Sequence, residues 1–200
     1  MRKTVVDFLR HGEPQGGNVY RGQQDDELTL LGWQQMQRHL VDKPPWQTIL
    51  TSPLKRCAAF ADHIRQECNI DVHHQKDLQE IHFGQWQGLT AEQIEANDKA
   101  GFFAFYDDPL NNTPPLAESL EAFQQRCLSA WQQVLVQHQG EHSLVITHAG
   151  VIRIILVHVL SMPLTALFQI DVPFASLSRI EVQTTDKGHF SRLMFHAGQL

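Results

Sequence analysis

Short apolar runs recur along the chain and favour β-strands. Thr4–Leu9 (TVVDFL) is rich in β-branched residues, which is typical of a strand buried on both faces. Thr48–Thr51 (TILT) and Ser143–Thr147 (SLVIT) predict two more strands. Leu177–Val182 predicts a late strand, with Phe190–Phe195 as its neighbour.

Longer stretches with apolar residues three or four positions apart predict helices between these strands. One covers Thr29–Leu40, and another follows SLVIT at Val151–Leu160. A third is expected to open at Ser52-Pro53, with Ser52 as the N-cap and Pro53 at the first helical position. The clearest amphipathic helix has its apolar face at Leu116, Leu120, Phe123, Cys127, Trp131 and Val134.

Alternating strands and helices predict an α/β fold, a three-layer α/β/α sandwich with a mostly parallel central sheet. Residues 84–115 interrupt the alternation with glycines, prolines and a cluster of aromatic residues. We expect this segment to be a helical cap over one end of the sheet. The whole chain, residues 1–200, is then expected to be a single domain.

Composition narrows the classes of partner. The chain has 200 residues, 42% of them apolar, and a formal net charge of −6, which disfavours general binding to nucleic acid or anionic membranes. Cys57, Cys68 and Cys127 form no CxxC motif and suggest free thiols in a reducing cytoplasm. The short N-terminal apolar run does not resemble a signal peptide. We therefore expect a soluble cytoplasmic protein.

Residues suited to phosphate chemistry lie just after three of the predicted strands, Arg56 in the first turn that follows its strand. They are Arg10, His11 and Gly12 after the first strand, Arg56 after TILT and His148 after SLVIT. Ligands of open α/β sheets bind beyond the carboxyl ends of the strands, so these residues should share one rim. Gly12 would let the backbone approach a ligand closely. Glu80, in LQEIHFGQWQG, would add a carboxylate.

Two arginines, two histidines and a glutamate suit phosphoryl transfer without a metal. The arginines would neutralise phosphate oxygens, one neutral histidine would attack phosphorus, and the other, protonated, would stabilise the equatorial charge. The glutamate would protonate the leaving alkoxide and later activate water. His11 and His148 lack a third ligand at a recognisable spacing, so neither a metal nor another cofactor is expected.

Five motifs occur in the order found in one known family: LRHGE, LTLLGWQQ, TSPLKR, LQEIHFGQWQG and VITHAGVIR. By them the chain resembles the histidine phosphatase superfamily, also called the phosphoglycerate mutase-like family. The resemblance implies a phosphoglycerate mutase-like fold, with His11 as the residue that becomes phosphohistidine. It also implies that Arg10, Arg56 and His148 form the phosphate pocket and that Glu80 is the proton donor.

The motifs also indicate a branch of that superfamily. Ala149 follows His148, where the acid phosphatases of the superfamily carry aspartate, so the acid must come from elsewhere. EIHFGQWQG and RGQQDDELTLLG look most like the α-ribazole 5′-phosphate phosphatases of cobalamin assembly. The alternatives are a broad-specificity small-molecule phosphatase, a phosphoglycerate mutase and a non-enzymatic module that binds a phospho-ligand.

A second set of residues provides candidate contacts to the substrate. The family often has an asparagine six residues after the nucleophile; here Gly17 has that spacing and Asn18 comes next, so a backbone amide replaces the side chain or the loop is reset. Arg21 is a candidate for the pocket mouth. The aromatic cluster at 102–106 is either core or a platform for an aromatic leaving group. The expected partner is a small-molecule phosphate ester, and the sequence leaves open whether the protein is a homodimer.

Overall fold

The computed structural model describes residues 2–198. Its centre is a six-stranded sheet with the strand order β3-β2-β4-β1-β5-β6. The strands are β1 (Arg2–Arg10), β2 (Thr48–Thr51), β3 (Asp71–His74), β4 (His142–Thr147), β5 (Leu177–Thr185) and β6 (Gly188–Gly198). Strands β3, β2, β4 and β1 are parallel, and β5 and β6 form an antiparallel edge. This confirms the predicted α/β class and all five predicted strands.

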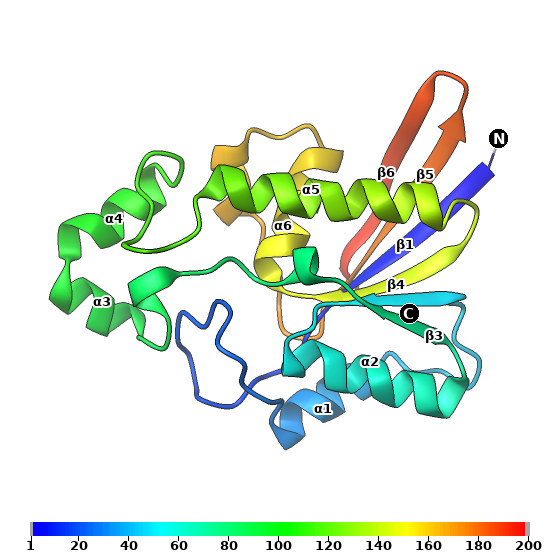
Figure 1. The fold of residues 1–200 in the computed structure, drawn as a ribbon, viewed down its shortest axis with the longest axis horizontal. Coiled ribbons are helices and arrows are strands. Elements are labelled where there is room, and N and C mark those ends of the chain that lie inside the picture. The colour runs from blue at the N-terminus through cyan, green and yellow to red at the C-terminus, as the bar shows by residue number, and fades with distance from the viewer. Residues whose placement is uncertain (1, 199–200) are drawn as a thin grey trace.

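Helices cover both faces of the sheet (Figure 1). One layer contains α1 (Leu30–Gln37) and α2 (Lys55–Cys68), and the other contains α5 (Leu120–Gln137) and α6 (Ala149–Val159). Two short helices, α3 (Ala91–Asn97) and α4 (Lys99–Asp107), belong to the segment expected to form a cap. Figure 1 shows them beyond one end of the sheet, away from the β5–β6 hairpin. Three 3₁₀ helices complete the fold at Lys76–Leu78, Gly84–Trp86 and Leu164–Gln169.

Alternating side chains of the strands fill the two layers of the core. On β1, Phe8 packs in the cluster that contains α5 and α6, whereas Leu9 packs in the cluster that contains α1 and α2. On β4, Val145 faces the first cluster and Ile146 the second. This is the period-two alternation of a sheet buried on both faces. Each such side chain contributes about 1.5–3 kcal/mol of burial free energy.

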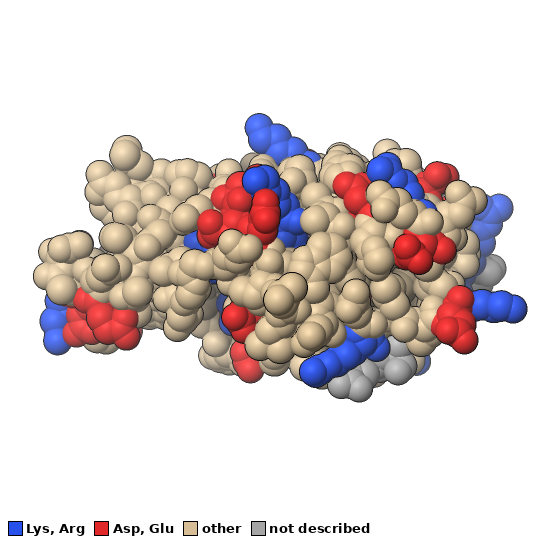
Figure 2. All heavy atoms as spheres, turned by 90° about the horizontal axis from the view of Figure 1, so that it is seen from below, with Lys and Arg blue, Asp and Glu red and all other residues tan. Residues whose placement is uncertain are grey.

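The surface view in Figure 2 shows acidic and basic side chains interspersed on one face of the molecule. No helix among residues 2–198 is long and apolar enough to cross a membrane. The three cysteines are free, with Cys57 and Cys127 buried and Cys68 half-buried.

A fully buried carboxylate lies in the middle of β1. Asp7 accepts hydrogen bonds from Trp46 Nε1 at 2.8 Å, His142 Nε2 at 2.9 Å and Arg179 Nε at 2.7 Å. Burial alone raises the pKa of Asp7, but the bonds from His142, Arg179 and Trp46 outweigh it and hold that pKa below its ordinary value. This group, the Asp7 cluster, is therefore a satisfied buried ion network that ties β1 to β5.

Three local predictions were wrong. α2 begins at Lys55 with Leu54 as its N-cap, so Ser52 does not cap the helix and Pro53 is not its first residue. The Ser52 hydroxyl accepts instead from the Leu54 amide, at 3.3 Å, because the chain turns once more before the helix. Leu116 has a φ of 59° and is 80% exposed, since α5 begins only after its N-cap Ser119. No strand was expected at β3, a mostly exposed edge strand without an apolar run.

Candidate active site

A cavity of about 490 Å³ lies beside the carboxyl end of β1, the N-terminal part of α6 and the cap. Its acidic and basic lining residues are Arg10, His11, Arg21, Arg56, Glu80 and Arg153. Its aromatic lining residues are Tyr20, Phe83, Phe105, Tyr106, Phe123 and Phe168. The structure therefore brings four of the five residues predicted to be catalytic to one cavity and adds Arg153, which was not predicted. Among residues 2–198 no group of three or more His, Cys, Asp or Glu side chains is arranged to hold a metal ion.

His11 has the tautomer that a nucleophile needs. Its Nδ1 lies 2.7 Å from the carbonyl oxygen of Gly12, and because a carbonyl only accepts, Nδ1 must carry the proton. Burial, Arg56 and Arg10 lower the pKa of His11 well below its ordinary value, so the ring is neutral. The lone pair is therefore on Nε2.

Gly12 has a packing role that the sequence did not predict. A Cβ at Gly12 would lie 2.1 Å from the carbonyl oxygen of Gly32 on α1. The close approach that glycine permits is thus between the turn after β1 and helix α1. It fixes the backbone whose carbonyl orients His11.

His148 lies behind His11, with 5.2 Å between the ring centroids, and it does not line the cavity. Arg56 Nε donates to His148 Nδ1 at 3.3 Å, so His148 Nε2 carries the proton and donates to the Ser52 hydroxyl at 2.8 Å. Burial, Arg56 and His11 lower the pKa of His148 well below its ordinary value. The sequence led us to expect a protonated His148, but His148 is neutral in this structure because it is buried and lies beside cations.

The two predicted arginines are held by backbone carbonyls. Arg56 is 1% exposed and donates to the carbonyls of Gln24 and Gly22, both at 2.7 Å. Arg10 donates to the Val172 carbonyl, and its guanidinium lies 4.0 Å from the ring centroid of Phe174. Each terminal nitrogen keeps a second hydrogen, so both forks can still bind phosphate oxygens.

Two backbone amides hold the Glu80 carboxylate at the wall of the cavity. One carboxylate oxygen accepts from the Ile81 amide and the other from the Gly150 amide, both at 3.1 Å. A Cβ at Gly150 would lie 2.2 Å from the carboxylate, so only glycine leaves room for it. This orientation suits a group that must meet a leaving oxygen.

Arg126 orients the backbone around Glu80. The sequence did not predict this role of Arg126. It lies on α5 and donates to the carbonyls of Asp77 at 2.9 Å, Gln79 at 2.7 Å and Glu80 at 3.0 Å. It also pairs with Glu118 at 2.7 Å. The sequence showed only a polar position on an amphipathic helix, with no motif to distinguish it.

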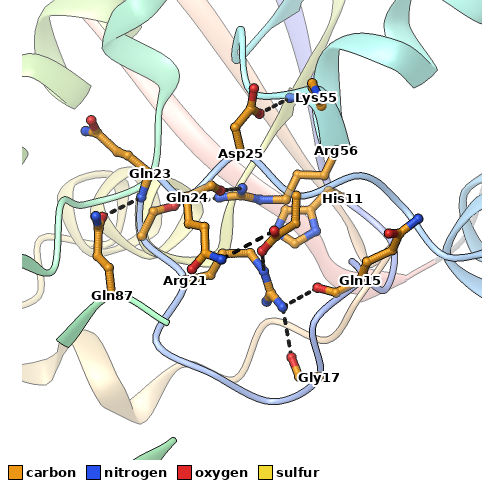
Figure 3. A network of polar contacts seen from close by, with 12 residues as sticks. His11, Gln15, Gly17, Arg21, Gln23, Gln24, Asp25, Lys55, Arg56 and Gln87 are labelled. Atoms are coloured by element: carbon orange, nitrogen blue, oxygen red, sulfur yellow. Dashed lines mark hydrogen bonds and ion pairs between the residues drawn. The ribbon is translucent and has the colours of Figure 1, made fainter. Parts of the chain in front are cut away.

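The loop after β1 is organised by Arg21 (Figure 3). Arg21 Nε pairs with Asp26 at 2.7 Å, and Nη2 donates to the carbonyls of Gln15 at 2.6 Å and Gly17 at 2.9 Å. Arg21 lines the cavity as expected, but these partners occupy its guanidinium. Gly17 is exposed and lies outside the lining, whereas Asn18 is part of it. A contact between Gly17 and phosphate is therefore not what this geometry favours.

The aromatic cluster at 102–106 divides between two roles. Phe102 is buried against Trp86 in the cap core, which also contains Phe105, and it does not line the cavity. Phe105 and Tyr106 do line it, and both lie against Phe168. The cap thus gives the cavity an aromatic wall backed by its own small core.

The chain matches the histidine phosphatase superfamily (branch 1) over residues 6–193 and belongs to it. Phosphoglycerate mutase-like protein 4 of Arabidopsis thaliana is 33% identical over 146 residues, covering 70% of this chain and 64% of that protein. The adenosylcobalamin/alpha-ribazole phosphatase of Escherichia coli K12 is 28% identical over 153 residues, covering 70% of this chain and 75% of that enzyme.

Among solved structures, Bacillus stearothermophilus YhfR superposes with a TM-score of 0.84 at 27% identity, covering 98% of both chains. The chain spans 41% to 64% of the length of the curated relatives that it matches first. Membership of the superfamily confirms the resemblance that the five motifs indicated.

Proposed function

We propose that this chain is a metal-independent phosphomonoesterase that acts through a phosphohistidine on His11. One observation carries the proposal: His11 is neutral and oriented by the Gly12 carbonyl, with its Nε2 lone pair free, in a cavity lined by arginines. A neutral imidazole beside fixed cations is what attack on a phosphate dianion requires.

In the first half-reaction, His11 Nε2 attacks phosphorus, and the bond from phosphorus to the ester oxygen breaks. Glu80, protonated before this step, gives its proton to the leaving oxygen, so the products are an alcohol and phosphohistidine. Arg10 and Arg56 balance the charge on the phosphoryl oxygens. The bound dianion opposes the cations that lower the pKa of His148, and so favours the protonated His148 that the sequence led us to expect.

In the second half-reaction, water attacks the phosphoryl group and Glu80, now a carboxylate, accepts a proton from it. The bond from His11 Nε2 to phosphorus breaks, which restores the neutral imidazole and releases orthophosphate. The same glutamate thus serves as acid and then as base, which its position at the cavity wall allows.

α-Ribazole 5′-phosphate, an intermediate of cobalamin nucleotide-loop assembly, is the substrate we propose first. Two observations support it: the similarity to the Escherichia coli phosphatase and the aromatic wall of the cavity. Phe105, Tyr106 and Phe168 offer apolar faces on which the benzimidazole ring of that ester could stack.

The test is release of inorganic phosphate in the presence of EDTA. The esters are α-ribazole 5′-phosphate, 3-phosphoglycerate, a nucleoside monophosphate, a sugar phosphate and para-nitrophenyl phosphate. We expect wild type to release phosphate, His11→Ala to release none, and the exposed His158→Ala on α6 to match wild type. Release from α-ribazole 5′-phosphate alone would support the cobalamin assignment, and comparable release from several esters would indicate a generalist.

Two alternatives give different results. A phosphoglycerate mutase, suggested by the name of the plant relative, would convert 3-phosphoglycerate into its 2-isomer faster than it releases phosphate. A non-enzymatic binding module would bind an ester without turnover and without acid-labile phosphate on His11. Either result, obtained with folded protein, would overturn the phosphatase proposal.

A further inference from the structure

Arg153 is a cation in the cavity that none of the steps above uses. It lies on α6, three residues after Gly150, and is half-buried in the cavity wall. Its Nε donates to the Ile170 carbonyl at 2.8 Å, which fixes the side chain. Within residues 2–198 no carboxylate lies within 4.0 Å of its guanidinium, and its two terminal nitrogens have no hydrogen-bond partner in the protein.

Arg153 is held beside Arg10. The carbonyls that anchor the two guanidinium groups belong to Ile170 and Val172, two residues apart, and Arg153 acts on Arg10 through its charge. Residues three apart on a helix share a face, so Arg153 lies on the same side of α6 as Gly150, whose amide binds Glu80. Arg153 is thus on the proton-donor side, where the leaving group of the ester must lie.

The charges in the cavity do not balance without a second negative group. Arg21 is neutralised by Asp26, which leaves Arg10, Arg56 and Arg153. Glu80, the one carboxylate in the lining, is uncharged when it acts as an acid. The three cations of the lining then face a phosphate dianion, so at least one positive charge remains, and a protonated His148 behind His11 adds another. Asp171 acts on Arg10 through its charge, but it is exposed and pairs with neither arginine.

We propose that Arg153 is a specificity-determining residue, a second anion subsite that favours esters whose leaving group carries a negative charge a few bonds from the scissile phosphate. This rests on the proposed phosphatase activity and refines its substrate class. α-Ribazole 5′-phosphate has no such charge on its leaving group, so its hydrolysis would not depend on Arg153. A carboxylate on the leaving group would bind the free guanidinium edge through charge-assisted hydrogen bonds.

The experiment compares two esters that differ in one group, 3-phosphoglycerate and glycerol 3-phosphate. We would measure kcat/KM for phosphate release in wild type, Arg153→Gln and the surface control Arg38→Gln. A hydrogen bond to a charged group contributes about 1.5–3 kcal/mol, which corresponds to a preference of about 10- to 150-fold. We expect wild type and Arg38→Gln to prefer 3-phosphoglycerate by this factor, and increasing salt to reduce the preference.

In Arg153→Gln we expect the ratio of the two kcat/KM values to fall to about one. Activity on glycerol 3-phosphate and para-nitrophenyl phosphate should stay within about threefold of wild type, because neither leaving group is charged in the ester. An unchanged ratio would overturn the proposal. An equal loss on all three esters would also overturn it, since it would mean that Arg153 binds the scissile phosphate.

A binding measurement separates this inference from the proposed function. Calorimetric titration of the same two esters into His11→Ala, with and without Arg153→Gln, gives the preference without turnover. Tighter binding of 3-phosphoglycerate that disappears with Arg153→Gln would support the subsite even if the wild type hydrolysed neither ester. Equal binding of the two esters would refute the subsite even if the wild type proved to be a phosphatase.

Discussion

Two polar sites lie only three residues apart on β1 and differ in how their charge is satisfied. At Asp7 a buried carboxylate meets Trp46, His142 and Arg179, and each donor reaches it at 2.7–2.9 Å. At Arg10 the positive charge exceeds the negative charge nearby, and the buried Nε has no hydrogen-bond partner in the protein. Buried polar groups are almost always paired, so an unpaired one needs an explanation.

The difference separates two kinds of charge on one strand: structural charge, which stabilises the fold, and functional charge, which binds a ligand. The Asp7 cluster is complete without a ligand, so we expect it to act on stability alone. The cavity at the end of β1 is complete only when an anion enters, so we expect it to act on binding and rate. Variants at the two sites should therefore change different measurements.

Among the variants that test this comparison, Arg56→Ala should give the largest effect. Arg56 lines the cavity in which we propose that phosphate binds, and it also donates to His148, so its loss removes a cation and an orienting bond. Cations that balance a transferring phosphoryl group contribute about 10³-fold or more, and kcat/KM on any ester should fall by that much. Arg65→Ala, an exposed arginine on the same helix, is the matched control. A loss below about tenfold, in protein with native circular dichroism, would contradict a role in the cavity.

Glu80→Gln should cost about 10²–10⁴ in rate on alkyl esters, the usual share of general acid–base catalysis. The loss should be smaller for para-nitrophenyl phosphate, because its leaving group needs little protonation. Glu67→Gln, an exposed glutamate on α2, serves as the control. If both ester types lose the same factor, Glu80 is not the proton donor.

The sequence predicted the positions of the chemistry well because strand ends are predictable. Hydrophobic runs located β1, β2 and β4, and the carboxyl ends of parallel strands share one edge, so Arg10, His11 and Arg56 were expected together. Glu80 does not lie at the end of a predicted strand, so only its motif identified it. That motif does not show the amide of Gly150, seventy residues away, that holds the carboxylate.

What the sequence could not show depends on burial and on distant partners. Arg126 and Arg153 occupy polar positions on amphipathic helices, and such positions are usually exposed to solvent. The neutral state of His148 follows from burial beside Arg56, which only the packed structure reveals. The packing of Gly12 against α1 was missed because it depends on a backbone segment distant in the sequence. The position of Leu116 was misjudged because it depends on where α5 begins.

Asp7→Asn should change stability and leave activity intact. Removing one partner of a buried ion pair costs about 3–5 kcal/mol, so the free energy of unfolding should fall by roughly that amount, with kcat/KM unchanged in the folded fraction. Because the pKa of Asp7 is lowered, wild type has this stabilisation above about pH 4 and loses it as the pH falls through the lowered pKa. Urea titrations at pH 7 and at low pH would measure the loss of stability in Asp7→Asn and its dependence on pH in wild type.

The matched control for this variant is Asp71→Asn on the exposed edge strand β3, which should change the free energy of unfolding by less than about 0.5 kcal/mol. If Asp7→Asn lowered activity in protein shown to be folded, the Asp7 cluster and the cavity would be coupled. The separation between structural and functional charge on β1 would then fail.

Inorganic phosphate should give the smallest predicted effect, a modest increase in the free energy of unfolding. An anion that binds only the folded state stabilises it by RT ln(1 + [L]/Kd), about 1.4 kcal/mol at tenfold excess over Kd. For a chain of this size that raises Tm by about 3–6 °C. Sodium chloride at matched ionic strength should not reproduce the shift, and Arg56→Ala should abolish it. Asp7→Asn should keep the full shift from a lower starting Tm, because its missing charge is not one that the phosphate satisfies.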